Sequence, residues 1–249
     1  MKQENIRSKN KKDSNLRLIS SAIRNISKKG INETTMHDVS HGAGLSQGIV
    51  NFHFKSKEIL LIETLKFISN EYLTSFQEKL KKAGNDPRKK IITIINNDFN
   101  KNICSRDKIA VWFTFFSELK FKPAYHQICK DRDLYYQNIT ENIFKDLIEK
   151  EKIEISVKNI SRGFQALVMG LWLDLLEDPD TFSHIKSKKI CFDYIKSHFP
   201  KCSIMYSDVV LSKKPTMVLT PFFFATLAAC PAGSTPWHGI LDATKCCNR

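Results

Sequence analysis

The sequence predicts an all-α fold, and three observations lead to that prediction. Apolar residues recur at steps of three and four up to about residue 201, as they do on one face of a helix. The same stretch has no alternating apolar and polar segment long enough for a strand. Only nine Gly and eight Pro occur in 249 residues, which argues against a turn-rich all-β fold. We therefore expect helices alone, about nine of them, ahead of a C-terminal tail of different character.

Four helices are predicted in the N-terminal third, over residues 16–29, 35–41, 47–52 and from 56 onward. The first ends at Gly30, because glycine readily adopts the left-handed backbone that closes a helix. Thr35 and Asp38 have the spacing of a capping box, in which each side chain binds the other residue's backbone N–H. Ser56 is expected to cap the fourth helix, which is long.

Five more helices are predicted, over residues 87–99, 107–119, 123–150, 157–176 and 179–200. Asp86-Pro87 and Asp178-Pro179 each place a capping residue before a first-turn proline, so each pair is expected to start a helix. The helix over 157–176 has one broad apolar face, formed by Phe164, Leu167, Val168, Leu171 and Leu175.

Both ends of the chain differ in composition from the helical part. Residues 1–12 are rich in Lys and Arg, which favours a basic disordered arm or a plain solubilising tail. Because no apolar run follows this polar start, we expect no secretory signal and a cytoplasmic location. Residues 202–249 have no helical period and are expected to be an appended irregular tail outside the fold. A membrane-contacting tail is the alternative; otherwise no membrane association is expected.

The formal net charge is +13, which suits a polyanionic partner such as nucleic acid or an anionic membrane. Thr34 to Leu61 contains two short helices joined by a glycine-containing turn, the pattern of a helix-turn-helix. In that motif the second helix enters the major groove and its first residues contact base edges.

Each type of residue in this segment suits the motif. Ala43 is small where the two helices approach, and Gly44 permits the backbone of the turn. The side chains expected to hold the unit onto its neighbours are Val39, Leu45, Ile49 and Phe54. Those expected to face outward are Ser46, Gln47, Gly48, Val50 and Asn51.

This segment resembles the DNA-binding domain of the TetR family of bacterial repressors, through Thr34-Thr35, the run AGLSQG, Phe54 and Lys57. The resemblance implies that Thr35 and Lys57 hold backbone phosphates of operator DNA. It also implies that Gln47, Gly48 and Asn51 lie over the bases, with Ser46 beside them. His53 stands where the family usually has a phosphate-contacting Tyr. Chemically, Gln and Asn suit bidentate contact with adenine.

Residues 13–201 further resemble one TetR branch, the choline-responsive repressors of glycine betaine synthesis, through AVWFTFFSE, PAYHQICKDR and VMGLWL. The resemblance implies a DNA-binding domain over 13–62, a ligand-binding and dimerisation domain over 63–201, and choline or betaine aldehyde as effector. It also implies a homodimer as the DNA-binding species.

Proteins hold a quaternary ammonium by cation–π attraction inside an aromatic cage, often with a carboxylate nearby. The predicted cage residues are Trp112, Phe115, Phe116, Tyr135, Tyr136 and Trp172. Glu118 and Asp174 are the candidate carboxylates, although neither shares a helix face with the neighbouring Trp. Plain core packing of these aromatic side chains is the alternative.

The two recognition helices of a dimer have to reach major grooves roughly 34–36 Å apart. A ligand wedged among the connecting helices changes that spacing and so opposes DNA binding. The predicted dimer interface is the apolar face of 157–176 together with Phe182, Ile185, Tyr194 and Ile195. Packing of that face inside one subunit is the alternative.

Other functional classes have weaker support. His37 and His41 are spaced like part of a zinc-protease motif, but the predicted helix is short and a third ligand is lacking. Cys104, Cys129 and Cys191 are expected to be small buried side chains. We therefore predict no enzyme activity, no catalytic residues, no metal and no cofactor. A TetR-type regulator of efflux or lipid metabolism that senses an apolar ligand stays open as the alternative.

Overall fold

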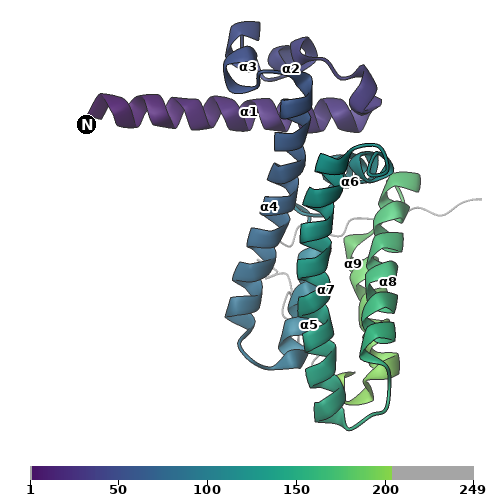
Figure 1. The fold of residues 1–249 in the computed structure, drawn as a ribbon. Coiled ribbons are helices and arrows are strands. Elements are labelled where there is room, and N and C mark those ends of the chain that lie inside the picture. Colours follow the sequence, from purple (N-terminus) through teal and green to yellow (C-terminus); the bar gives the residue numbers. More distant parts are fainter. Residues whose placement is uncertain (1, 204–249) are drawn as a thin grey trace, which may run out of the picture. The chain divides into compact units, whose positions relative to one another are not determined.

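The computed structural model describes residues 2–203, and this part of the chain contains nine α-helices and no strand (Figure 1). The helices are α1 (Lys2–Glu33), α2 (Met36–Gly42), α3 (Gln47–His53), α4 (Lys57–Ala83), α5 (Pro87–Asp98), α6 (Arg106–Ser117), α7 (Pro123–Glu151), α8 (Val157–Glu177) and α9 (His184–His198). The all-α prediction is confirmed for these residues. None of their helices is both long and apolar enough to cross a bilayer. The predicted C-terminal tail lies almost wholly outside the described residues.

One hydrophobic core joins the first four helices. It includes Leu18 and Ile26 of α1, Val39 of α2 and Val50 of α3, each almost completely buried. Helix α6 enters the same core, where it packs against α1. The helix-turn-helix is therefore attached to the rest of the molecule through α4 and α6.

A second core fills the bundle formed by α4, α5, α7, α8 and α9. Figure 1 shows α7 beside α8, and the two helices are in contact. Helix α4 continues without a break across residues 62 and 63, where we expected a domain boundary, and contributes side chains to both cores. The largest fully buried side chains of the second core are Phe76, Phe99, Phe144, Phe164 and Phe199.

The predicted dimer face on α8 packs inside the subunit instead. Phe164, Val168, Leu171 and Leu175 are each at most 6% exposed, and they belong to the second core. Leu167 is half-buried against the same core, and Ile195 of α9 is buried as well. Helical periodicity predicts that a face is covered but not which chain covers it. For these residues the intramolecular alternative is correct.

Most of the predicted helix starts are observed. Thr35 and Asp38 form the capping box of α2, Ser56 caps α4, and Asp86 caps α5 with Pro87 in its first turn. Asp178 does not start a helix. Its carboxylate accepts hydrogen bonds from the backbone N–H and hydroxyl of Thr181, which closes a turn.

Helix α9 begins after Ser183, which supplies the N-cap in place of Asp178. The side chain of an Asp can accept from the backbone a few residues ahead in a turn as well as in a helix. The Asp-Pro pair alone therefore does not distinguish a turn from the start of a helix.

The N-terminal segment also differs from expectation. Residues 2–12 continue α1, where we predicted a disordered arm. Extending an existing helix adds one hydrogen bond per residue fixed, whereas starting one is costly, so a polar segment can continue a helix nucleated by its neighbours. Gly30 does interrupt α1, with φ +79°, and the last turn beyond it runs in a new direction.

Candidate nucleic-acid interface and aromatic pockets

The turn between α2 and α3 depends on Gly44. This residue has φ +61°, a left-handed conformation that glycine adopts without steric cost. The guanidinium of Arg17 in α1 donates to the carbonyl of Ala43 at 2.7 Å, and the N–H of Leu45 donates to the carbonyl of Ser40 at 3.0 Å. These bonds hold the two short helices in a fixed arrangement on α1.

Helix α3 presents its polar residues to solvent. Ser46, Gln47, Gly48 and Asn51 are exposed, as predicted from the sequence. Val50 is fully buried, so its predicted outward position is wrong. Val50 and Phe54 stand four residues apart and both enter the core, which turns the opposite side of α3 outward.

Two residues near the end of α3 contact α1. The imidazole of His53 lies 2.8 Å from the hydroxyl of Ser14, measured from Nε2 to Oγ. Partial burial, with Lys11 nearby, lowers the pKa of His53 and so favours the neutral ring. The ammonium of Lys11 lies 5.4 Å from the ring centre of Phe52, which is 62% exposed. The exposed face of α3 is therefore bordered by a basic turn of α1.

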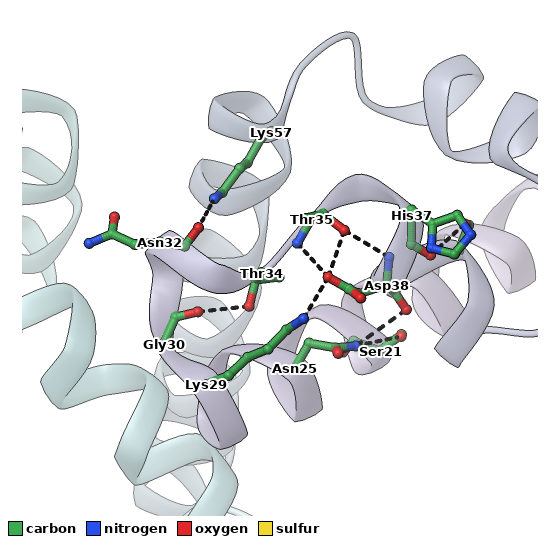
Figure 2. Close-up of polar contacts among 11 residues, drawn as sticks. Ser21, Asn25, Lys29, Gly30, Asn32, Thr34, Thr35, His37, Asp38 and Lys57 are labelled. Atoms are coloured by element: carbon green, nitrogen blue, oxygen red, sulfur yellow. Dashed lines mark hydrogen bonds and ion pairs between the residues drawn. The ribbon is translucent and has the colours of Figure 1, made fainter.

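Thr35 and Lys57 lie near the start of α2 (Figure 2). The Thr35 N–H and hydroxyl donate to one carboxylate oxygen of Asp38, at 2.8 and 2.6 Å, and Lys29 binds the same oxygen at 2.7 Å. The hydrogen bond from Lys29, followed by those from Thr35, holds the pKa of Asp38 well below its usual range.

Figure 2 shows the ammonium of Lys57 reaching the carbonyl of Asn32, at 2.8 Å. The ammonium is thus positioned beside the N-terminus of α2, where backbone N–H groups favour anions.

An aromatic cluster lies in the second core, between α4, α7 and α8. The ring of Tyr72 is 6.1 Å from that of Tyr136 and 6.3 Å from that of Trp172. The hydroxyls of both tyrosines donate to the carboxylate of Asp98, at 2.7 and 2.8 Å. Trp172 Nε1 donates to the backbone carbonyl of Asp98 at 3.1 Å. Three aromatic side chains are therefore anchored on one residue at the end of α5.

Asp98 is completely buried, and burial raises its pKa to about 6 although the tyrosine hydrogen bonds act in the opposite direction. The same burial and the neighbouring Asp98 charge raise the pKa of Tyr72 and Tyr136 well above the usual value.

Two adjoining pockets open beside this cluster, with about 330 and 560 Å³ of empty space that includes some open solvent. Both are lined by Tyr72, Arg132 and Trp172. The first also includes Trp112 and the ion pair between Lys108 and Glu71, and the second includes Tyr136, Gln137, Arg162 and Gln165.

The structure brings together only part of the predicted cage. Trp112, Tyr136 and Trp172 line the pockets. Phe115 is buried against Tyr125, with ring centres 4.9 Å apart, and so belongs to the first core.

The other predicted cage residues also lie elsewhere. Phe116 is 41% exposed, and Tyr135 packs beside Phe76. Neither predicted carboxylate lines either of these two pockets: Asp174 is exposed on α8, and Glu118 follows the end of α6.

Sequence reasoning missed Tyr72, Asp98 and Arg132. Asp98 had a signal, because it stands next to last in the segment IITIINNDF, three and four residues after the buried Ile95 and Ile94 and so on the same helix face. His37 and His41 stack on each other with ring centres 6.3 Å apart. Among the described residues, no group of three or more His, Cys, Asp or Glu is placed to hold a metal ion.

Two families match the chain. Residues 18–64 match the family described as "Bacterial regulatory proteins, tetR family", and residues 87–200 match "BetI-type transcriptional repressor, C-terminal". The chain is 26% identical over 187 residues to the HTH-type transcriptional regulator BetI of Pectobacterium carotovorum subsp. carotovorum (strain PC1), covering 74% of this chain and 93% of the relative.

Solved structures share the fold. A transcriptional regulator from Saccharomonospora viridis in complex with choline has a TM-score of 0.63 at 18% identity, covering 74% of this chain and 96% of that one. The regulator FadR from Bacillus subtilis in complex with stearoyl-CoA has a TM-score of 0.59 at 16% identity, covering 72% and 95%. Because these two proteins bind different ligands, the fold alone does not select the ligand.

Proposed function

We infer that the chain, which belongs to the TetR family and has a BetI-type C-terminal domain, is a transcriptional regulator and not an enzyme. From that premise we propose that it binds operator DNA as a homodimer in the cytoplasm, represses transcription and is released by a small quaternary ammonium effector such as choline or betaine aldehyde. The observation that carries the DNA-binding part is the exposed face of α3, with Gln47 and Asn51 outward and Val50 inward.

The proposed base contacts come from Gln47 and Asn51, with Gly48 allowing close approach of the backbone to the groove. The hydroxyl of Ser40 donates to the side-chain carbonyl of Gln47 at 3.1 Å, which orients that amide. The proposed phosphate contacts come from Thr35, Lys57 and the N–H of His53, with Ser46 at the N-terminus of α3 beside them. Phosphate contacts fix position and affinity, whereas base contacts carry sequence preference.

Substitutions on α3 and α4 separate these two roles. Gln47→Ala and Asn51→Ala are each expected to reduce discrimination between operator and scrambled DNA by about 1–3 kcal/mol. Lys57→Ala is expected to weaken binding to both duplexes equally and to lower the salt slope by about 1. Fluorescence anisotropy over a range of salt concentrations measures both quantities, using a duplex that the protein selects from a random pool.

The matched control is Lys66→Ala, because Lys66 lies about 13 Å further along α4 and pairs with Glu63. It is expected to leave both the preference and the salt slope unchanged. Equal effects of the α3 substitutions and Lys57→Ala would mean that α3 does not read the groove.

The proposed dimer surface is the side of α8 that the bundle leaves uncovered. Ala166, Gly170 and Leu173 are exposed at steps of four and three, so they form an apolar stripe. Ile185 at the start of α9 is 78% exposed. Small and apolar exposed side chains of this kind suit a helix from a second subunit.

The effector is proposed to bind in the pockets between Trp112, Tyr72 and Trp172. Aromatic faces attract a quaternary ammonium, and the buried carboxylate of Asp98 accepts hydrogen bonds from the hydroxyls of Tyr72 and Tyr136, which line the pockets. Trp112 Nε1 is buried and has no hydrogen-bond partner among the described residues, so a ligand hydroxyl or carbonyl oxygen fits that donor. The polar lining favours a charged ligand over the purely apolar one of the alternative.

Helix α6 offers a route from the pocket to the DNA-binding helices. Trp112 and Lys108 line the pocket from α6, and Asp107 on the same helix accepts a hydrogen bond from Ser27 of α1 at 2.7 Å. A ligand that shifts α6 therefore shifts α1 and the helix-turn-helix that α1 supports.

Choline is therefore expected to release the operator. Millimolar choline chloride should raise the melting temperature of the protein and weaken operator binding by a coupling of about 1–3 kcal/mol. Thermal unfolding and anisotropy measure these effects, with sodium chloride of equal ionic strength as control. If choline chloride and sodium chloride weakened operator binding equally, choline would not be the effector. The proposal that the protein binds operator DNA would be unaffected.

A further inference from the structure

The aromatic site is already occupied by a cation of the protein itself. The guanidinium carbon of Arg132 lies 3.7 Å from the ring centre of Trp112 and 5.4 Å from that of Tyr72. The side chain of Arg132 is only 11% exposed, although it belongs to a helix whose outer face is in solvent. A guanidinium stacked at this distance makes the same type of contact that an aromatic cage offers to a ligand ammonium.

The surrounding charges hold Arg132 in this position. Its Nε donates to the carboxylate of Asp133 at 2.9 Å, and the two side chains form an ion pair. Glu71, the other carboxylate lining the pockets, is paired with Lys108. Deeper in the core, the carboxylate of Asp98 accepts a hydrogen bond from Tyr72, whose ring lies beside Arg132, and the positive charge of Arg132 acts to lower the pKa of Asp98. Arg132 therefore supplies the positive charge that the aromatic rings and these carboxylates attract.

We propose that Arg132 is an internal competitor of the effector: it fills the aromatic site in the ligand-free protein, and a cationic ligand binds only by displacing it. This inference rests on the proposed function for the class of ligand. Arg132 then sets the specificity of the site, because only a cation that interacts with Trp112 and Tyr72 at least as well as a guanidinium can replace it. The displaced side chain stays paired with Asp133, whose carboxylate is 46% exposed and lies toward solvent.

Arg132 also lies between the two hydrophobic cores. Trp112 belongs to the core of the DNA-binding helices, and Tyr72 belongs to the core of the bundle. Replacing a planar guanidinium with a bulkier tetrahedral ammonium changes the separation of these two side chains. The exchange of cations therefore acts on α6 at the point where the pocket and the DNA-binding helices meet.

The test measures binding of tetramethylammonium chloride to the full-length protein by calorimetry, without DNA. Arg132→Ala is expected to bind this ion about tenfold more tightly than the original protein, because the competing cation–π contact is removed. Arg132→Lys, which keeps the charge but not the planar group, is expected to show a smaller increase. The matched control is Arg162→Ala, which removes a positive charge from the same pocket without removing a group stacked on Trp112.

A second measurement tests whether the ligand binds in the space that the Arg132 side chain occupies. N-ethylguanidinium replaces the deleted side chain, so it should raise the melting temperature of Arg132→Ala and compete with tetramethylammonium, and should do neither in the original protein. If Arg132→Ala does not fold, the affinity of Arg132→Lys for tetramethylammonium tests the proposal by itself. An unchanged affinity in the folded variants, or an equal increase in Arg162→Ala, would overturn the proposal. Because DNA is absent, failure of choline to release the operator would contradict the proposed function and not this inference.

Discussion

Phe164→Ala is expected to lower the free energy of unfolding of each subunit by about 3–5 kcal/mol. Phe164 has no exposed surface, and its ring packs against Phe144 at 5.7 Å and Tyr194 at 6.4 Å between ring centres. Replacing the ring with a methyl group leaves a cavity that the surrounding helices can fill only in part. Urea unfolding at several protein concentrations measures the loss and separates it from any change in association.

Ile185→Lys is the matched comparison, because this side chain is also apolar but is 78% exposed. It is expected to leave the unfolding of a single subunit nearly unchanged and to shift sedimentation toward the monomer. If Phe164→Ala instead separated the subunits without lowering their stability, the α8 face would lie between subunits and the intramolecular packing described above would be wrong.

The elements that could be predicted from sequence are those governed by local rules. The capping box of Thr35 and Asp38 and the Asp86-Pro87 start involve residues within three positions of each other. The Asp178-Pro179 prediction failed because the same local chemistry serves both turns and helix starts. Val50 was misplaced because a seven-residue helix has too few turns for periodicity to fix its phase.

The pocket could be predicted only in part, because its residues come from separate helices. Trp112 and Trp172 are conspicuous as large aromatic residues in apolar segments. Tyr72, Asp98 and Arg132 lie on α4, α5 and α7, and no spacing along the chain links them. Their association depends on how the bundle packs, which is a tertiary property. Arg132 was the hardest to predict, since a charged residue on an amphipathic helix ordinarily faces solvent.

Asp98→Asn is expected to change how stability depends on pH. The carboxylate has a pKa of about 6 in the folded protein against 3.8 as the unperturbed value, so the folded state binds the proton more tightly. Protonated Asp98 therefore stabilises the folded state at low pH. This stabilisation is lost as the pH rises from 3.8 to about 6. Integrated from pH 4 to pH 7, a pKa difference of this size corresponds to a loss of about 2 kcal/mol.

The measurement has to be a difference between two proteins, because other carboxylates act in the opposite direction. Hydrogen bonds to Lys29 and Thr35 depress the pKa of Asp38, so the stability that this residue contributes is lost as the pH falls. Urea unfolding of both proteins at pH 4, 5.5 and 7 cancels that common effect. The stability of Asp98→Asn relative to the original protein should rise by about 2 kcal/mol over this range.

Asp193→Asn is the control for this measurement, because Asp193 pairs with Lys189 on the surface of α9 and is half exposed. It is expected to show a difference below about 1 kcal/mol at every pH. If the stability difference between Asp98→Asn and the original protein also stayed constant with pH, Asp98 would be ionised from pH 4 upward. The positive charges of Arg132 and Lys79 would then outweigh burial, and the pocket would carry a permanent negative charge behind its tyrosines. If the stability difference instead rises steeply with pH, the carboxylate of Asp98 is charged at pH 7 and lowers the stability of the folded protein. A bound cation would reduce this loss of stability.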